Sequence, residues 1–312
     1  MENNEITIHD IAHILGIDSS TVSRALNDSP RVAKKTKEKI ITKAKELGYE
    51  RNHLASNLRK SKTFTLGVIV PRISRHFFAS AIAGIEETAY KAGYNVIICQ
   101  TMESLEREKR IINTLLANRV DGVLISISME TENYDHLQDL KKRNIPYVFF
   151  DRHFNIPGNS NVVVNDFEAA FAAVEHLILN KSKNIVHFAG PQNLEIYINR
   201  LKGYKAALNK YEIPYREEFV IISKLMQKDG IKNTKKILDL SANVDGIFCA
   251  NDVIAISTIQ YLKSKNIKIP EEIAIVGFNN ETIAAVIEPA LTTINQPGVK
   301  IGVTAADLLL DK

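Results

Sequence analysis

The stretch Thr7–Asn27, T-I-H-D-I-A-H-I-L-G-I-D-S-S-T-V-S-R-A-L-N, predicts two short helices joined by a tight turn. Apolar side chains recur at helical spacing on both sides of Gly16-Ile17-Asp18. Gly16 can adopt the left-handed conformation at which a helix ends, and Asp18 can cap the helix that follows. Two such helices form a helix-turn-helix, whose second helix can lie in the major groove of DNA.

The second predicted helix presents short hydroxyl groups and long hydrogen-bond donors on its outer face. These side chains are Ser19, Ser20, Ser23, Arg24 and Asn27. Hydroxyl, guanidinium and amide groups suit both base edges and phosphates. On this pattern alone, a capped helix pair inside a helical bundle is an equally good interpretation, because glycine turns between helices are common.

The excess positive charge of the chain lies at its N-terminal end. Residues 1–62 hold 12 of the 40 lysines and arginines and 8 of the 36 aspartates and glutamates. The remaining residues carry equal numbers of both signs. A small basic domain is suited to a polyanion such as DNA. A solvated basic helix, such as the stretch 34–45, occurs in many proteins, so the charge supports DNA binding without deciding it.

Two further segments follow the helix pair. Residues 34–47 carry an apolar stripe and predict a third helix, which completes a small and marginally stable core. Residues 52–59 are also helix-capable, and Leu58 lies there beside Arg59. Leu58 could insert as an apolar wedge into the DNA minor groove or pack onto the next domain, and the residues alone leave both options open.

The motifs T-I-x-D-I-A, G-I-D-S-S-T-V-S-R-A-L-N, T-K-E-K-I, L-G-Y and N-x-x-A-x-x-L resemble the LacI/GalR family of bacterial transcription regulators, and the resemblance continues over nearly the whole chain. It implies that Ser19, Ser20 and Arg24 read bases in the major groove. The residues that it assigns mainly to phosphates are Thr7, Ser23, Asn27, Thr36, Tyr49 and Asn52. Ala55 and Leu58 would belong to a DNA-binding hinge helix at about residues 52–60, although Arg51 replaces the proline that usually precedes it.

The rest of the chain alternates apolar runs with helical stretches. The runs are Leu66–Val70, Val96–Cys99, Val123–Ile127, Tyr147–Phe150, Val162–Val164, Ile185–Ala189, Phe219–Ile222, Gly246–Ala250 and Ala274–Phe278. Near-continuous apolar strands separated by helices predict parallel sheets that are covered on both faces.

A V-D-G-apolar pattern occurs twice, in Asn118–Ile125 and in Ala242–Cys249, and it indicates two similar doubly wound halves. The resemblance implies the same periplasmic-binding-protein-like architecture. We therefore expect an all-α helix-turn-helix domain at residues 1–62 and an α/β effector-binding and dimerisation domain at 63–312. Its first half is expected at about 63–160 plus 293–312, and its second half at about 161–292.

A ligand between two such halves would meet the carboxyl ends of the strands. The candidate side chains there are Phe77, Phe78, Gln100, Thr101, Asp151, Arg152, Asp166, Arg200, Asn251, Asp252, Asn279 and Asn280. Together they suit vicinal hydroxyls or the edge of a heterocycle. Each also has a structural alternative: Asp166 and Asp252 could cap helices, Arg200 could form a surface ion pair, and Phe77 could fill the core.

The resemblance strengthens the assignment of Phe78, Asp151, Arg200 and Asn251 to the effector site. Asn279 departs from the family, which usually has G-F-D-D where this chain reads G-F-N-N. A neutral amide removes a carboxylate that often grips sugar hydroxyls, so an ordinary hexose is a less secure expectation. The G-F-N-N and E-P-A-L-T-T segments resemble family members from Bacteroidetes.

Other classes of protein find little support in the sequence. Phosphate-binding glycine loops and hydrolase or metalloprotease motifs do not occur, and the eight histidines lack metal-ligand spacing. We expect no catalytic residues, metal or cofactor, and we interpret Cys99 and Cys249 as reduced core thiols. A sugar-binding or sugar-modifying protein fused to a DNA-binding domain is the main alternative. A transport binding protein is opposed by the helix-turn-helix and by a polar N-terminus without a signal peptide.

The sequence therefore predicts a cytoplasmic, homodimeric repressor with no membrane association. Its expected partners are double-stranded operator DNA and a small, sugar-like effector. The chain stops within a helical pattern at residues 307–312, where members of the family continue with further strands. We accordingly expect Leu308, Leu309 and Leu310 to be poorly covered.

Overall fold

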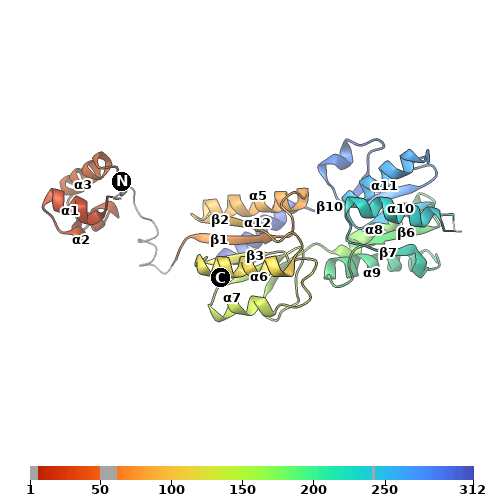
Figure 1. The fold of residues 1–312 in the computed structure, drawn as a ribbon, viewed down its shortest axis with the longest axis horizontal. Coiled ribbons are helices and arrows are strands. Elements are labelled where there is room, and N and C mark those ends of the chain that lie inside the picture. The colour runs from red at the N-terminus through yellow and green to blue at the C-terminus, as the bar shows by residue number, and fades with distance from the viewer. Residues whose placement is uncertain (1–5, 50–61, 241–242) are drawn as a thin grey trace. The chain divides into compact units, whose positions relative to one another are not determined.

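The computed structural model describes residues 6–49, 62–240 and 243–312. The chain forms two compact units, residues 1–61 and 62–312 (Figure 1). The segment expected to form the hinge helix, with Asn52, Ala55 and Leu58, lies outside the described residues.

The first unit contains α1 (Ile8–Leu15), α2 (Ser19–Leu26) and α3 (Lys34–Glu46). Thr7 caps α1 through a reciprocal pair of hydrogen bonds with Asp10, and Gly16 ends the helix at a φ of 65°. The backbone N–H of Ser20 then donates to the carboxylate of Asp18 over 2.7 Å, which starts α2. The three helices enclose a small apolar core of Ile11, Ala12, Val22, Ala25, Val32, Ile40 and Ala44.

The second unit contains two five-stranded parallel sheets (Figure 1). The first has the strand order β2-β1-β3-β4-β5, from β1 (Thr65–Val70), β2 (Asn95–Gln100), β3 (Gly122–Ile125), β4 (Tyr147–Phe150) and β5 (Ser160–Val162). The second has the order β10-β9-β8-β6-β7, from β6 (Ile185–Ala189), β7 (Val220–Ile222), β8 (Gly246–Cys249), β9 (Ala274–Asn279) and β10 (Thr292–Asn295). The expected fold class, with two parallel α/β halves, is confirmed.

Helices and short 3-10 turns connect these strands. They are α5 (His76–Lys91), α6 (Leu105–Ala117), η1 (Asp135–Leu137), α7 (Gln138–Lys142), α8 (Asp166–Leu179), α9 (Glu195–Lys210), η2 (Glu217–Phe219), α10 (Gln227–Leu238), α11 (Asp252–Ser264), η3 (Thr282–Ala285) and α12 (Gly298–Leu310). Within the described residues, no helix is long and apolar enough to cross a membrane.

The last helix, α12, packs against α5 of the first half. A Cβ atom at Gly302 would lie 2.0 Å from the carbonyl oxygen of Ala81, so glycine permits this close approach. Leu309 is buried and lies against Gly122, so it is covered, contrary to the expectation for the C-terminal leucines. Leu308 is partly exposed, as an outward-facing neighbour on the same helix.

Strand pairing moves the boundaries between the halves by two or three residues. β5 pairs with β4, so the chain stays with the first sheet through Val162 rather than leaving it at about residue 160. β10 pairs with β9, so the chain stays with the second sheet through Asn295 and returns only with α12. The expected strand at 162–164 also starts earlier, at Ser160, because it is the register with β4 that sets its ends.

Candidate functional site

The helix α2 exposes part of the face that was expected to read DNA. Ser20, Arg24 and Asn27 are exposed and Ser19 and Ser23 are half-buried, whereas Val22 and Ala25 on the opposite side are buried. Arg24 takes part in none of the ion pairs that the described residues form. Its guanidinium is therefore available for an external acceptor.

Two of the residues expected to anchor phosphates, Thr7 and Asn27, have side-chain hydrogen-bond partners within their own unit. The hydroxyl of Thr7 donates to the carboxylate of Asp10 over 2.7 Å, and the side-chain amide of Asn27 donates to the carbonyl oxygen of Ser23 over 2.7 Å. Thr36 and Tyr49 are half-buried. Nζ of Lys37 lies 2.6 Å from Oδ1 of Asp28, so this lysine already has an ion-pair partner within the three-helix unit.

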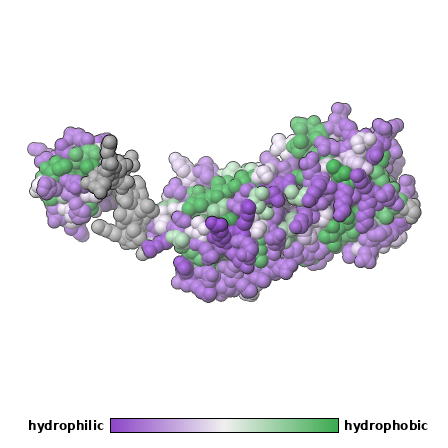
Figure 2. All heavy atoms as spheres, viewed as in Figure 1, coloured by the Kyte–Doolittle hydropathy of each residue, from purple (hydrophilic) through white to green (hydrophobic). Residues whose placement is uncertain are grey.

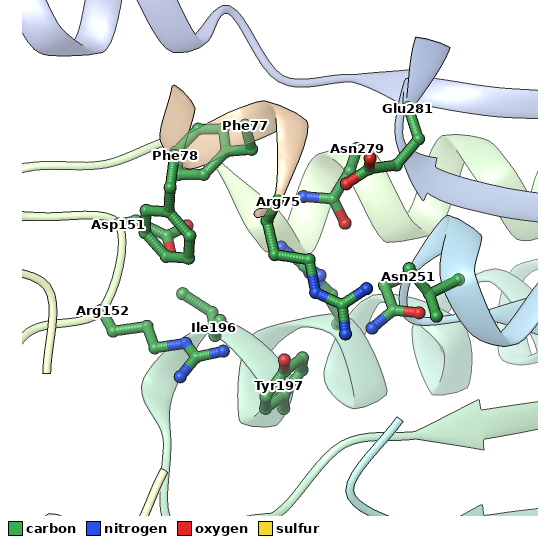
Figure 3. Close-up of a pocket in the computed structure, with 12 residues that line it drawn as sticks. Arg75, Phe77, Phe78, Asp151, Arg152, Ile196, Tyr197, Asn251, Asn279 and Glu281 are labelled. Atoms are coloured by element: carbon green, nitrogen blue, oxygen red, sulfur yellow. The ribbon is translucent and has the colours of Figure 1, made fainter. Parts of the chain in front are cut away.

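A pocket lies within the α/β unit (Figure 3). It is lined from the start of α5, the end of β4, the first two turns of α9, the start of α11 and the end of β9. The lining residues are Arg75, Phe77, Phe78, Asp151, Arg152, Ile196, Tyr197, Arg200, Asn251, Val253, Asn279 and Glu281. Because α5 and β4 belong to one half and α9, α11 and β9 to the other, the pocket lies between the halves.

Most residues expected at the effector site line this pocket. They are Phe77, Phe78, Asp151, Arg152, Arg200, Asn251 and Asn279. Asp166 is not part of the lining and instead forms an ion pair with Arg200, which is. Among the wider candidates, Asp252 accepts hydrogen bonds from Thr293 and Glu281, and Gln100 accepts one from the backbone of Ile73.

Sequence reasoning missed five lining residues, namely Arg75, Ile196, Tyr197, Val253 and Glu281. Spacing could have found one of them, since Tyr197 precedes Arg200 by three residues and shares its helix face. Arg75 stands two residues before the Phe77-Phe78 pair. It could therefore have been predicted on the same ground as that pair, namely that it follows the first strand. Glu281 follows β9 through a turn, and nothing in the sequence specifies where that turn points.

Arg200 lies at the centre of a buried ion pair. Its Nη2 and Nε atoms both lie 2.8 Å from Oδ1 of Asp166, and its Nη1 donates to the carbonyl oxygen of Ala250 over 2.6 Å. The guanidinium lies 3.6 Å from the ring centroid of Phe278. Arg200 and Asp166 are 2 % and 4 % exposed, so the pair is internal rather than a surface ion pair. Burial raises the pKa of Asp166, and Arg200 opposes that rise.

Arg152 is also paired, and its neighbour Asp151 is held in an unusual backbone conformation. Nη1 of Arg152 lies 2.7 Å from a carboxylate oxygen of Glu103. Asp151 has a φ of 60°, and burial raises its pKa to about 6. The side-chain amide of Gln296 donates to Asp151 over 3.3 Å and contacts the amide of Asn279. Gln296 thereby connects lining residues from the ends of β4 and β9.

Arg75 and Asn251 each precede a helix at the pocket. Asn251 caps α11, and its Oδ1 accepts a hydrogen bond from the backbone of Ile254 over 2.9 Å. Arg75 occupies the N-cap position of α5 but makes no side-chain capping bond. Its Nη2 instead donates a long hydrogen bond of 3.8 Å to the sulfur of Met226. Burial lowers the pKa of Arg75, and the negative charge of Glu281 acts in the opposite direction.

These groups suit reversible recognition of a polar molecule that has an apolar face. Guanidinium, carboxyl and amide groups alternate with the rings of Phe77, Phe78 and Tyr197. No group of three or more metal-binding side chains is found in the described parts of the chain. Cys249 is buried and Cys99 is half-buried, since Cys99 lies in the edge strand β2 rather than in the core where it was expected.

Two known families match the two units. Residues 7–52 match "Bacterial regulatory proteins, lacI family", and residues 63–312 match "Periplasmic binding proteins and sugar binding domain of LacI family". Catabolite control protein A of Priestia megaterium is 32 % identical over 307 residues, which cover 97 % of this chain and 91 % of that protein.

Two solved structures show the same fold. The Lac repressor dimer bound to operator and the anti-inducer ONPF has a TM-score of 0.87 at 25 % identity and covers 99 % of this chain and 92 % of its own. The complex of the transcriptional regulator CelR with cellobiose has a TM-score of 0.74 at 28 % identity, covering 98 % of this chain and 93 % of its own. The chain therefore belongs to the LacI family of bacterial regulatory proteins and is a DNA-binding transcription regulator rather than an enzyme.

Proposed function

We propose that the protein is a repressor whose affinity for operator DNA is set by a small, sugar-like ligand in the pocket between the two α/β halves. The pocket carries this proposal, because its lining comes from both halves. A ligand that contacts both halves favours one relative arrangement of them. It can then change a distant equilibrium by the difference between its affinities for the two arrangements.

For DNA, we infer that Ser19, Ser20 and Arg24 contact bases and that two copies bind a pseudo-palindromic site. One helix reads few base pairs, and two-fold symmetry doubles the number. The structurally similar Lac repressor is a dimer on its operator. In this chain, the edge strands β2 and β7 expose Ile98 and Ile222, which are 43 % and 57 % exposed and would suit contact with a second copy. A regulator of this kind would act in the cytoplasm, where its DNA is.

For the ligand, the same reasoning favours a compact polyol. Hydroxyl groups can accept from Arg200, Arg152 and Asn251, and the rings of Phe77 and Phe78 can cover the apolar face of a sugar. CelR, which shares this fold, was solved with cellobiose.

The surface of the α/β unit is largely hydrophilic in the view of Figure 2, with scattered apolar patches.

The experiment is a binding cycle with the full chain. An operator is first selected from random duplexes, and its affinity is then measured by fluorescence anisotropy with and without each sugar of a panel. Val253→Trp places a large ring in the pocket and should abolish the response to the sugar. Val163→Trp, at a site that is 44 % exposed, is the matched control and should respond normally.

Two results would contradict the proposal. One is the selection of a single asymmetric half-site as the full target. The other is a sugar that binds the pocket without changing operator affinity, because the coupling between two sites is reciprocal and must appear in both binding equilibria.

A further inference from the structure

We propose that the ligand carries a negative charge, a carboxylate or a phosphate on a polyol, and that Arg75 together with Arg152 binds this anionic group. This inference rests on the proposed function and specifies the chemistry of the same pocket. It follows from how differently the three arginines of the lining are paired.

Two of the three arginines are neutralised by nearby carboxylates. Arg200 lies 2.8 Å from Asp166, and Arg152 lies 2.7 Å from Glu103. Arg75 is in none of the ion pairs found within the described residues. Figure 3 shows its side chain extending among the lining residues, with Tyr197 and Asn251 nearby in the view. A guanidinium partly withdrawn from water without a bound carboxylate favours an anion brought by a ligand.

The carboxylates around Arg75 already have other partners. Glu281 lies at the pocket and accepts a hydrogen bond from the backbone of His76 over 3.4 Å, but its oxygens are not within ion-pair distance of Arg75. Asp151 accepts from Gln296. Neither acid is therefore bound to Arg75 as an ion-pair partner.

Arg152 provides a second and independent observation. This residue is 7 % exposed, and its Nε is a buried donor that finds no hydrogen-bond partner among the residues the structure describes. An unpaired buried donor is costly, so an acceptor supplied by the ligand would be favourable there. Because Arg75 precedes α5 and Arg152 follows β4, both donors come from the first half.

The start of α5 does not add to this preference, because the carboxylate of Glu281 already accepts from the backbone of His76 at the first position of the helix. The two arginines therefore carry the preference for an anion. An acidic or phosphorylated sugar suits this charge.

The test compares neutral and anionic forms of the same sugars. D-glucose and D-galactose, their uronates and their 6-phosphates are titrated calorimetrically into the full chain at constant ionic strength. We expect at least one anionic form to bind more tightly than its neutral parent. Arg75→Gln should weaken that anion by roughly 10- to 100-fold, the effect of losing a hydrogen bond to a charged group, and should leave the neutral parent nearly unchanged. The uronate and phosphate arms identify which anionic group is recognised.

Two controls keep the result specific. Arg110→Gln removes an exposed arginine on α6 and should change no affinity. Without ligand, Arg75→Gln should leave the melting temperature unchanged or raise it, because no ion pair is lost. Arg152→Gln should lower the melting temperature, because it leaves Glu103 without its ion-pair partner. A loss of stability in Arg75→Gln as large as that in Arg152→Gln would assign Arg75 a structural role and overturn the proposal.

Three binding results would also overturn it: neutral sugars that bind as tightly as their acids, an Arg75→Gln variant that loses both forms equally, or no binding of any anionic probe. If a neutral sugar releases the operator in these cases, the proposed function stands and only the anionic ligand is refuted. If no probe changes operator binding, the proposed function fails as well.

Discussion

The three-helix unit and the α/β unit place their candidate functional residues in opposite ways. In the first, Ser19, Ser20 and Arg24 lie on one eight-residue helix, at least partly exposed, while other residues form the core. In the second, the lining of the pocket is drawn from residues as far apart as Arg75 and Glu281, and much of it is buried. This difference predicts that recognition and stability are separable in the first unit and depend on the same residues in the second.

The largest effect expected from this comparison is at Arg200. Arg200→Gln leaves Asp166 buried without its ion-pair partner, which should lower the stability of the α/β unit by about 3–5 kcal/mol. The ligand response should be lost with it. Urea unfolding, followed by circular dichroism, measures this cost. The double variant Arg200→Gln/Asp166→Asn should recover part of the stability but not the ligand response, and a single variant as stable as the wild type would contradict the shared role.

The next effect tests the core of the three-helix unit. Ile11 is fully buried, so Ile11→Ala should cost about 2–5 kcal/mol. In such a small unit, this loss should abolish operator binding. Ligand binding by the α/β unit should remain, as calorimetry would show. Ile14→Ala, at a site 51 % exposed on the same helix, is the matched control and should bind operator normally. Equal losses in both variants would remove the distinction between core and surface.

A smaller effect is expected at the exposed face of α2. Arg24→Ala should weaken binding to the selected operator by about 1–3 kcal/mol without changing the melting temperature. Fluorescence anisotropy on the operator and on a scrambled duplex separates specific from general binding. Arg110→Ala, on an exposed face of α6, should behave as the wild type. A drop in stability for Arg24→Ala would mean that this face, too, combines recognition with packing.

The last effect depends on pH and concerns the shared role of Asp151. Because burial raises its folded pKa to about 6, the folded protein retains a proton that the unfolded chain loses near pH 4. This group therefore lowers stability progressively as the pH rises from about 4 to 6, and the cost persists above that range. Asp151→Asn, which removes the titrating carboxyl, should be more stable than the wild type at pH 7.5.

That difference should shrink toward pH 4, as thermal melts across the range would reveal. Asn also tolerates the left-handed backbone at this position, where φ is 60°. Asp307→Asn, at an exposed site on α12, should show no comparable trend. A constant difference between Asp151→Asn and the wild type at all pH values would contradict burial as the cause of the raised pKa.

The sequence by itself determined the local elements and the class of the fold. The helical spacing around Gly16 predicted α1 and α2, and the alternation of apolar runs with helices predicted two parallel α/β halves, because the spacing of apolar residues shows which faces of each element are buried. Strand ends are also readable from sequence, and Asp151 and Asn279 could be placed at the pocket on that ground. Periodicity alone assigns no function to individual residues, and the resemblance to a family supplied the expected roles.

Only the tertiary structure decided which of these residues meet and how they are paired. Asp166 and Arg200 lie 34 residues apart and form a buried ion pair, whereas Arg75 enters the pocket with no carboxylate of the described residues within ion-pair distance. Strand register, not composition, set the points where the chain crosses between the halves. The physical reason is that burial and pairing depend on side chains brought together from distant segments, and their cost or gain is defined only once the whole fold has excluded water from between them.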